Sequence, residues 1–371
     1  MTIGIDARLY FESGVGRYIK NTLLELDYYT AKNKTSDKYF IFLSNKGFEK
    51  ISFESDALIK VKADVPWHSL KEQVNFTRIL NSYNLDLMHF TYFSLPIFYR
   101  RKFVVTIHDL IINYVNTGKA TTLPKPIYYL KRAAYHKVIE HAVKKSAHII
   151  APSHATKNEI LKNYKVNKEK ISVIAEGIDP DLFKKSTKPN ALVPGKYILY
   201  VGNAYPHKNL NSLINAYRMI EDEVDEDLVL VGKDDYFYKK IHNQIEGDTR
   251  IHIFNSINDY ELSYLYKNAS FLVSPSLMEG FGLTPLEAMA NNCLPVVSSI
   301  DAFKEVCENA ALYFNPESLK DIAGVLKKAI LINKNEKERY EKLFKDRIKK
   351  FSWEKSLLDT LKIYERCNSI R

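Results

Sequence analysis

No apolar run in this sequence approaches the roughly 20 residues that a helix needs to span a bilayer. The first residues, MTIGIDARLY, also lack the basic region and long apolar stretch of a secretion signal. Cysteine is scarce: Cys293, Cys307 and Cys367 are an odd number without metal-ligand spacing, and we interpret them as small core residues. These absences predict a cytoplasmic protein whose cysteines serve packing.

The composition is that of a folded protein, with 46% hydrophobic and 26% charged residues. A chain of 371 residues exceeds what one hydrophobic core usually organises, so we expect two domains. The formal charge of +10 is compatible with nucleic acid, an anionic membrane surface or phosphorylated small molecules as partners. Charge alone does not choose among these three.

The chain repeats one rhythm, in which short runs of β-branched and aromatic residues alternate with longer segments of helical spacing. The rhythm stops at residues 181–196, where Lys, Pro, Asn and Gly replace any periodicity, and then restarts. Such alternation is typical of parallel, doubly wound sheets, so we predict an α/β fold. The predicted strands lie at residues 2–7, 39–43, 87–90, 103–107 and 148–152, and then at 197–201, 228–232, 251–254, 271–275 and 294–298.

We accordingly predict an N-terminal domain at residues 1–185, a C-terminal domain at 186–350 and a final helix at 351–371. Ser352 is placed to cap this helix. One face of the helix could pack on either domain, so it could cross back to the first one. That face carries Trp353, Leu357, Leu361 and Tyr364.

The most informative segment is the turn GFGLTPL, which Glu279 and Glu287 bracket. Gly280 and Gly282 permit close backbone approach or positive φ, and a helix starting at Thr284-Pro285 offers free amide hydrogens and a favourable dipole to an anion. A diphosphate-linked sugar would fit there. The same Thr284 and Glu287 also form a capping box, which needs no ligand.

The segment YVGNAYPHKNL places Gly202 after a predicted strand and Lys208 at a predicted helix start. The order strand, glycine, basic residue, helix is typical of phosphate binding. A lysine point charge there could stabilise a leaving diphosphate. The alternative is an ordinary surface lysine.

In the first predicted domain, Gly14 and Gly16 lie in the turn between the first strand and its helix. A plain tight turn explains them as well as a ligand does. The GVG pattern is not followed by the third glycine of a dinucleotide fingerprint, which argues against an oxidoreductase.

His108 ends the apolar run FVVTI. It is a candidate for polarising or positioning a reacting centre, and the alternative is a structural histidine with Asp109 as its partner or as a helix cap. We interpret His89 as packing between strands and Glu176 as a loop residue near the hinge, and both stay outside the predicted site.

The segment SPSLMEGFGLTPLEAMA resembles, almost word for word, the signature of the family-4 glycosyltransferases, in which seven residues separate two glutamates. Further matches are WHSLKEQVNF at 67, APSHATKNEI at 151, VIAEGID at 173 and FSWEKS at 351, so the resemblance spans nearly the full chain. It implies the GT-B fold, with two Rossmann-like domains facing a central cleft, and transfer with retention of the donor's anomeric configuration.

The resemblance also implies roles for individual residues. Glu279 and the backbone at 281–283 would hold the donor sugar, and Glu287 the ribose hydroxyls. Relatives commonly carry an additional arginine in the loop after Gly202, where this chain has Asn203, so charge neutralisation rests on Lys208 alone or on Lys208 aided by Lys233. The implied catalytic residues are His108, Lys208 and Glu279, and the implied donor contacts are Gly14, Gly16, Gly202, Asn203, Lys208, Gly232, Lys233, Glu279, Gly280, Phe281, Gly282, Leu283 and Glu287.

No metal or other cofactor is implied, so we interpret Asp234-Asp235 as loop or helix-start residues. Within this family the full-length pattern favours mannose from GDP-mannose, transferred to a hydroxyl of a lipid-linked or growing polysaccharide. A UDP-sugar donor is the alternative. Nucleotide-sugar epimerases and phosphorylases share the architecture, but the first would show different acid-base residues and the second a pyridoxal phosphate lysine.

A basic amphipathic helix is predicted at residues 125–145, where cationic side chains interleave with tyrosines and aliphatic residues. It suggests peripheral contact with an anionic membrane at the inner face of the cell membrane. The alternative is a solvated helix packed on the first domain. We expect no nucleic-acid partner, because no helix-turn-helix, zinc-finger or aromatic RNA-binding signature is present.

Overall fold

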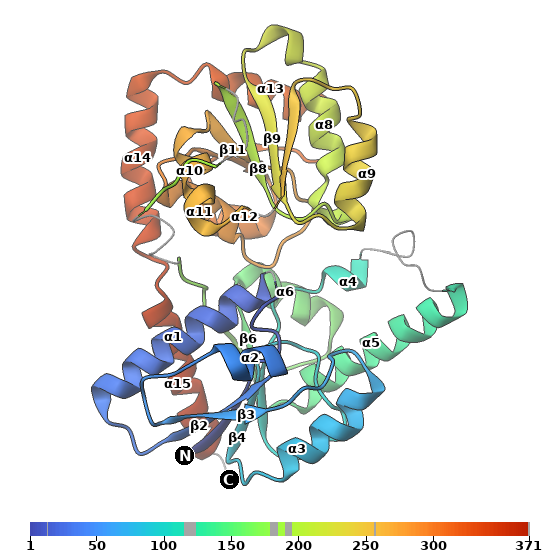
Figure 1. Ribbon diagram of the computed structural model, residues 1–371, viewed down its shortest axis with the longest axis vertical. Coiled ribbons are helices and arrows are strands. Elements are labelled where there is room, and N and C mark those ends of the chain that lie inside the picture. The colour runs from blue at the N-terminus through green and yellow to red at the C-terminus, as the bar shows by residue number, and fades with distance from the viewer. Residues whose placement is uncertain (13, 115–123, 179–184, 190–194, 256, 370–371) are drawn as a thin grey trace. The chain divides into compact units, whose positions relative to one another are not determined.

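The computed structural model describes residues 1–12, 14–114, 124–178, 185–189, 195–255 and 257–369. The chain divides into two compact units (Figure 1). The first is built mainly from residues 1–113 and a stretch that ends at Gly177, with the C-terminal segment from Ser352 added, and the second runs from Ile178 to Phe351. The first unit thus ends at residue 177, against 185 in the prediction. Residues 181–184 and 190–194 of the predicted linker lie outside the described residues.

In the described part of the first unit, seven parallel strands form one sheet in the order β3-β2-β1-β4-β5-β6-β7. Ile5 of β1 lies opposite Ile41 of β2 and His89 of β4. The sequence did not predict β3 or β7. The strands are β1 (Thr2–Asp6), β2 (Lys38–Leu43), β3 (Leu58–Lys62), β4 (Leu87–Phe90), β5 (Phe103–Thr106), β6 (His148–Ala151) and β7 (Ile171–Val173).

Helices cover both faces of this sheet, and side chains that follow one another along a strand enter different cores. Val104 packs in the core shared with α1 and α15, which lie side by side in Figure 1, whereas Val105 packs under α3, α5 and α6. The C-terminal helix therefore packs on the first unit. The helices are α1 (Val15–Asn33), α2 (Asn45–Lys50), the π-helix η1 (Glu72–Phe76), α3 (Thr77–Asn81), α4 (Ile111–Tyr114), α5 (Lys125–Lys145), α6 (His154–Asn163), the 3-10 helix η3 (Lys168–Lys170) and α15 (Trp353–Ser369).

The second unit has a parallel sheet in the order β10-β9-β8-β11-β12-β13. One of its cores joins the apolar strand residues to α10 and α11, and the sequence did not predict β13. The strands are β8 (Tyr197–Val201), β9 (Asp227–Gly232), β10 (Ile251–Asn255), β11 (Phe271–Ser274), β12 (Pro295–Ser298) and β13 (Leu312–Phe314). The helices are η4 (Pro206–Lys208), α8 (Leu210–Arg218), η5 (Glu221–Glu223), α9 (Tyr236–Gln244), α10 (Asp259–Asn268), α11 (Leu283–Ala290), α12 (Asp301–Cys307), α13 (Leu319–Ile330) and α14 (Lys334–Ile348).

Both units are therefore doubly wound parallel α/β sheets, as the sequence predicted. In such sheets the strand order reverses direction beside the first strand, and ligands bind beyond the carboxyl ends of the strands at that point. The reversal lies between β1 and β4 in the first unit and between β8 and β11 in the second. Among the described residues, no helix is long and apolar enough to cross a membrane.

Candidate functional site

The loops that follow β8 and β11 meet at the reversal point of the second sheet. The ammonium of Lys208 donates to Oε1 of Glu279 at 2.6 Å, and the hydroxyl of Ser276 donates to the same oxygen at 2.6 Å. The side chains of Lys208 and Glu279 are 19% and 14% exposed. Lys208 ends the short helix η4, and α8 begins at Leu210. The helix therefore starts slightly later than at Lys208, where the sequence predicted its start.

The charges of this pair stabilise one another. Burial by itself raises the pKa of the Glu279 carboxyl, but the Lys208 ammonium and the Ser276 hydroxyl lower that pKa below its ordinary value. Burial and the Lys208 charge lower the pKa of His207 to about 4, so its imidazole is neutral at pH 7. The carboxylate of Glu279 is therefore held in its charged form by Lys208 and Ser276.

The glycine-rich turn after Glu279 leads directly into α11. Gly282 has φ +116° and is the N-cap residue, and a Cβ on it would lie 3.0 Å from the Phe303 ring. Helix α11 begins at Leu283, before Thr284, and has no side-chain cap. The capping-box interpretation of Thr284 is therefore wrong, and the first amide hydrogens of α11 remain suited to an anion. Phe281 is buried, and its ring packs 5.6 Å from that of Phe351.

Glu287 lies on α11 and is held from α10. Its Oε2 accepts a hydrogen bond from the hydroxyl of Tyr266 at 3.1 Å, and Glu287 itself is only 5% exposed. The amide of Asn291 donates to the Glu287 carbonyl at 2.9 Å and accepts from Ser263 at 2.9 Å. The structure thus fixes this carboxylate through partners other than those of Glu279.

Two buried tyrosines hold the loop after β8. The Tyr238 hydroxyl donates to the Gly202 carbonyl at 2.9 Å, and the Tyr200 hydroxyl donates to the Asn203 carbonyl at 2.5 Å. A Cβ on Gly232 would lie 2.1 Å from the Tyr238 ring, so only glycine leaves room for that ring. Both predicted glycines, Gly202 and Gly232, therefore contact the same tyrosine.

Of the charged residues after β9, Lys233 is exposed and Asp235 has a structural role. Asp235 is the N-cap of α9, where its carboxylate accepts from the backbone N–H groups of Phe237 and Tyr238. This agrees with the interpretation of Asp235 as a helix-start residue.

In the first unit, His108 follows β5 and is buried. Its Nδ1 lies 3.1 Å from Oε1 of Glu176, and its Nε2 lies 3.0 Å from the carbonyl oxygen of Thr91. The partner of His108 is therefore Glu176, while Asp109 accepts from the backbone N–H of Ile111. Of the two alternatives for Asp109, the contact with Ile111, the first residue of α4, agrees with a role at the helix start, whereas these two hydrogen bonds of His108 go to other residues.

Tyr18, near the start of α1, contacts the His108 ring. The Tyr18 ring packs edge-on against the His108 ring with centroids 4.8 Å apart, and the Tyr18 hydroxyl lies 3.2 Å from Oγ1 of Thr106. Gly14 has φ +72° at the N-cap of α1, and a Cβ there would meet no atom within 4 Å. A Cβ on Gly16 would lie 2.7 Å from the carbonyl oxygen of Tyr10. Gly14 is thus open to a ligand, whereas Gly16 is required for packing.

Sequence reasoning missed several residues that position the predicted ones. Ser276, Tyr266 and Tyr238 hold Glu279, Glu287 and Gly202, respectively, and Glu176 holds His108. Ser276 stands three residues before Glu279, so that spacing was the one local signal available. The others come from distant segments: Glu176 lies in the family match VIAEGID, whose sequence does not indicate His108 as its partner, and nothing in the local sequence indicates Tyr266 or Tyr238.

The comparisons with known proteins agree with this architecture. The protein family described as Glycosyltransferase Family 4 matches residues 55–182, and that described as Glycosyl transferases group 1 matches residues 183–347. Sucrose-phosphate synthase from Thermosynechococcus elongatus superposes with a TM-score of 0.77 at 17% identity over 100% of both chains. At that identity the likeness shows the fold.

Two curated bacterial proteins are similar over most of the chain. O-antigen chain mannosyltransferase RfbU of Salmonella typhimurium is 30% identical over 268 residues, which are 70% of this chain and 68% of that protein. O-antigen chain mannosyltransferase B of Escherichia coli is 26% identical over 304 residues, which are 77% and 76% of the two chains. Together with the two doubly wound units and the family matches on either side of residue 182, these similarities show that the chain belongs to the family-4 glycosyltransferases.

Proposed function

We propose that this glycosyltransferase transfers mannose from GDP-mannose to a hydroxyl of a lipid-linked or growing polysaccharide, with retention of configuration. The observation that carries the sugar assignment is the similarity to RfbU, a mannosyltransferase, over 70% of the chain. The paired Lys208 and Glu279 at the reversal point of the second sheet supply chemistry suited to a sugar diphosphate. A UDP-linked sugar is the alternative donor, because a few side chains decide such specificity.

The donor diphosphate binds Lys208 and the first amides of α11, which are cationic and dipolar groups. Once the ammonium of Lys208 binds the diphosphate, both carboxylate oxygens of Glu279 can accept hydrogen bonds from sugar hydroxyls. The Glu287 carboxylate, held by Tyr266, accepts from the two ribose hydroxyls.

The chemical step needs position and charge more than a protein nucleophile. The bond from C1 of the sugar to the diphosphate oxygen breaks, and the acceptor oxygen bonds to C1 on the same face. The proton of the acceptor hydroxyl passes to the leaving diphosphate. Lys208 stabilises the negative charge that grows on that leaving group, and no metal ion is required.

A surface of the first unit suits a lipid-linked acceptor. Helix α5 exposes the apolar side chains of Ile127, Tyr129 and Leu130 next to the exposed Lys131. Burying apolar side chains in an anionic surface while cations contact its headgroups is how interfacial helices bind membranes. We propose that α5 contacts the anionic inner face of the cell membrane.

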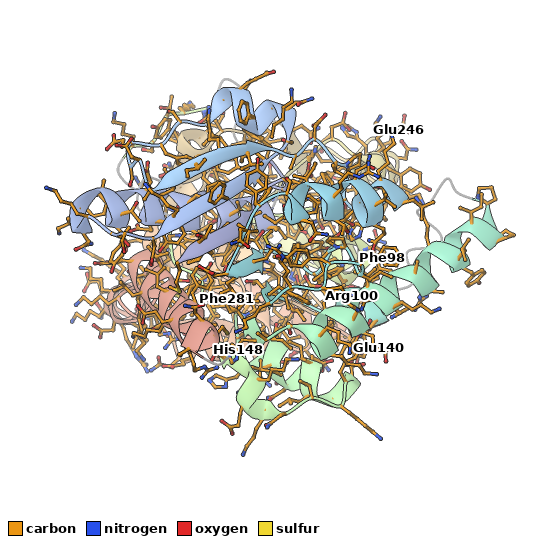
Figure 2. The ribbon with its side chains drawn as sticks, turned by 90° about the horizontal axis from the view of Figure 1, so that it is seen from below. Phe98, Arg100, Glu140, His148, Glu246 and Phe281 are labelled. Carbon is orange, nitrogen blue, oxygen red and sulfur yellow. The ribbon has the colours of Figure 1, made fainter. Side chains whose placement is uncertain are left out.

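The loop before β5 extends this surface. Figure 2 shows Phe98 and Arg100 alongside α5, on which Glu140 lies, and Phe98 is 54% exposed. The Arg100 charge acts on His141 of α5 and, after burial, is the next cause of its lowered pKa. An apolar ring and a second cation therefore stand beside the helix. Sedimentation with phosphatidylglycerol vesicles, set against phosphatidylcholine vesicles, should show binding that Leu130→Gln weakens.

The donor is tested by thermal unfolding of the purified protein with GDP, UDP, ADP and their sugar conjugates. We expect GDP and GDP-mannose to raise Tm most. At a 100-fold excess over its Kd, a ligand adds about 2.7 kcal/mol to the free energy of unfolding. NMR of the product's anomeric proton reports retention, and EDTA should leave the rate unchanged. A response to UDP-sugars alone would show that the donor is a UDP-sugar and not GDP-mannose. A product with inverted configuration would refute the proposed chemistry.

A further inference from the structure

The two ring nitrogens of His108 both face oxygen atoms. Nε2 lies 3.0 Å from the Thr91 carbonyl oxygen, which only accepts hydrogen bonds, so Nε2 carries a hydrogen. Nδ1 lies 3.1 Å from the Glu176 carboxylate. His108 and Glu176 are 8% and 5% exposed, so water does not replace these partners.

The proton between Nδ1 and the carboxylate belongs to the ring. A protonated ring donates from Nδ1 to the carboxylate oxygen and is attracted by the negative charge of Glu176. Burial alone would lower the pKa of His108, but the Glu176 carboxylate and the Thr91 carbonyl raise it above its ordinary value. Both nitrogens then donate, and the ring is an imidazolium.

The other charged groups around this ring act in the same direction or are neutral. The charge of Asp109 also raises the pKa of His108. His89, the nearby second histidine, is neutral, because burial and the His108 charge lower its pKa to about 3. Its two nitrogens bond to hydroxyl groups, those of Tyr364 at 2.6 Å and Thr106 at 2.8 Å.

Two tyrosines also face the His108 ring and add no charge. The Tyr18 ring is 4.8 Å away, and burial raises its pKa to about 12. The Tyr92 ring is stacked at 6.5 Å. Among the described residues, the carboxylates that raise the pKa of His108 are those of Glu176 and Asp109, and Glu176 is in hydrogen-bond contact with the ring.

Glu176 is itself fixed by packing at the end of the first unit. It lies between β7 and Gly177, and a Cβ on Gly177 would lie 2.3 Å from the backbone nitrogen of Trp353. The backbone next to Glu176 therefore sits directly against the start of α15. This close contact limits the freedom of the carboxylate to leave the His108 ring.

We propose that Glu176 is a positioning residue that keeps His108 an imidazolium, and that His108 serves the transfer as a fixed cation. With both N–H groups bonded to the protein, the ring does not exchange a proton with the substrate. The proposal rests on the proposed function.

The charge of His108 is measured directly by NMR of protein labelled with ¹⁵N-histidine, titrated without substrate. The His108 resonances are identified by their loss in His108→Gln. We expect both nitrogens to be protonated at neutral pH and the midpoint to lie above the ordinary value of about 6.5. In Glu176→Gln the midpoint should fall, because burial remains while the carboxylate is gone. A midpoint at or below about 6.5 in the unaltered protein would overturn the proposal.

The functional consequence is measured as kcat/KM against pH with GDP-mannose. Activity should fall as pH rises through the His108 pKa, and Glu176→Gln should move that limb to lower pH by about one unit or more. Glu365→Gln, which removes an exposed carboxylate of α15 in the same unit, should leave the profile unchanged. An equal loss at every pH would mean that Glu176 serves packing alone. Because the NMR titration needs no substrate, a wrong donor assignment leaves the charge of His108 separately testable.

Discussion

Replacing Lys208 by methionine tests the centre of the donor site, because it keeps most of the apolar stem of the side chain and removes the ammonium group, with its charge and its hydrogen-bond donors. The ammonium donates to Glu279 at 2.6 Å, and both side chains are less than a fifth exposed, at 19% and 14%. The variant therefore leaves a largely buried carboxylate with Ser276 as its remaining side-chain hydrogen-bond donor. Two separate losses follow, one in stability and one in catalysis.

The variant should lose about 1–3 kcal/mol of unfolding free energy at pH 7, because a buried hydrogen-bond acceptor is left without its charged partner. In the unaltered protein the pKa of Glu279 is lower in the folded state than in the unfolded state, where it is about 4.3. The ionised carboxylate therefore adds to the free energy of unfolding above that unfolded pKa. This added stability is lost as pH falls through the folded pKa. In Lys208→Met burial instead raises the pKa of this carboxyl. The difference in unfolding free energy should therefore be largest near neutral pH and shrink towards about pH 4.

The variant should also lose activity, because the preorganised positive charge of Lys208 no longer stabilises the leaving group. Removing one such group typically lowers the rate 10²- to 10³-fold, or about 3–4 kcal/mol. Urea unfolding at several pH values and kcat/KM with GDP-mannose measure the two losses, and Lys239→Met on the exposed face of α9 is the matched control. A variant that keeps more than a tenth of kcat/KM would refute the role of Lys208, and equal stability at all pH values would refute the ion pair.

Further predictions concern the residues that position the donor site. Tyr266→Phe removes the hydroxyl that holds Glu287, so KM for the donor should rise about 5- to 10-fold with little change in kcat, and an unchanged KM in steady-state assays would contradict this. Gly232→Ala places a methyl 2.1 Å from the Tyr238 ring and should cost about 1–3 kcal/mol in urea unfolding. Gly324→Ala in α13, where a methyl meets no atom within 4 Å, is the control and should be neutral or stabilising by up to about 1 kcal/mol.

The sequence predicted the fold class and the central strands because those strands are continuous runs of apolar side chains buried on both faces. It missed β3, β7 and β13, which all lie at the edges of their sheets. β3 reads LIKVK, with lysines among the apolar residues, and β7 and β13 have three residues each. An edge strand has a neighbour on one side only, so its sequence need not be uniformly apolar.

Within the site, the predictions that held were those set by neighbours in the chain. The prediction that a helix starts in the glycine-rich turn was correct, but the first residue of α11 was misplaced because Gly282 adopts a left-handed conformation beside Phe303, a contact from α12. The pairing of His108 with Glu176 was missed because 68 residues separate them and β6 lies between their strands. Local patterns do not encode which loops meet at a sheet edge.

The two ion pairs, one in each unit, share one feature. Lys208 is held by Glu279, and His108 is held by Glu176, so on our proposal each unit carries a cation that is already paired with a glutamate. A paired cation costs less to bury than a lone one, which allows both charges to stay in place without substrate. The pairs differ in what happens next. Lys208 and Glu279 stay partly exposed and can each turn to the donor, one to the diphosphate and the other to the sugar. Glu176 and His108 are buried more deeply and, on our proposal, remain paired throughout the transfer.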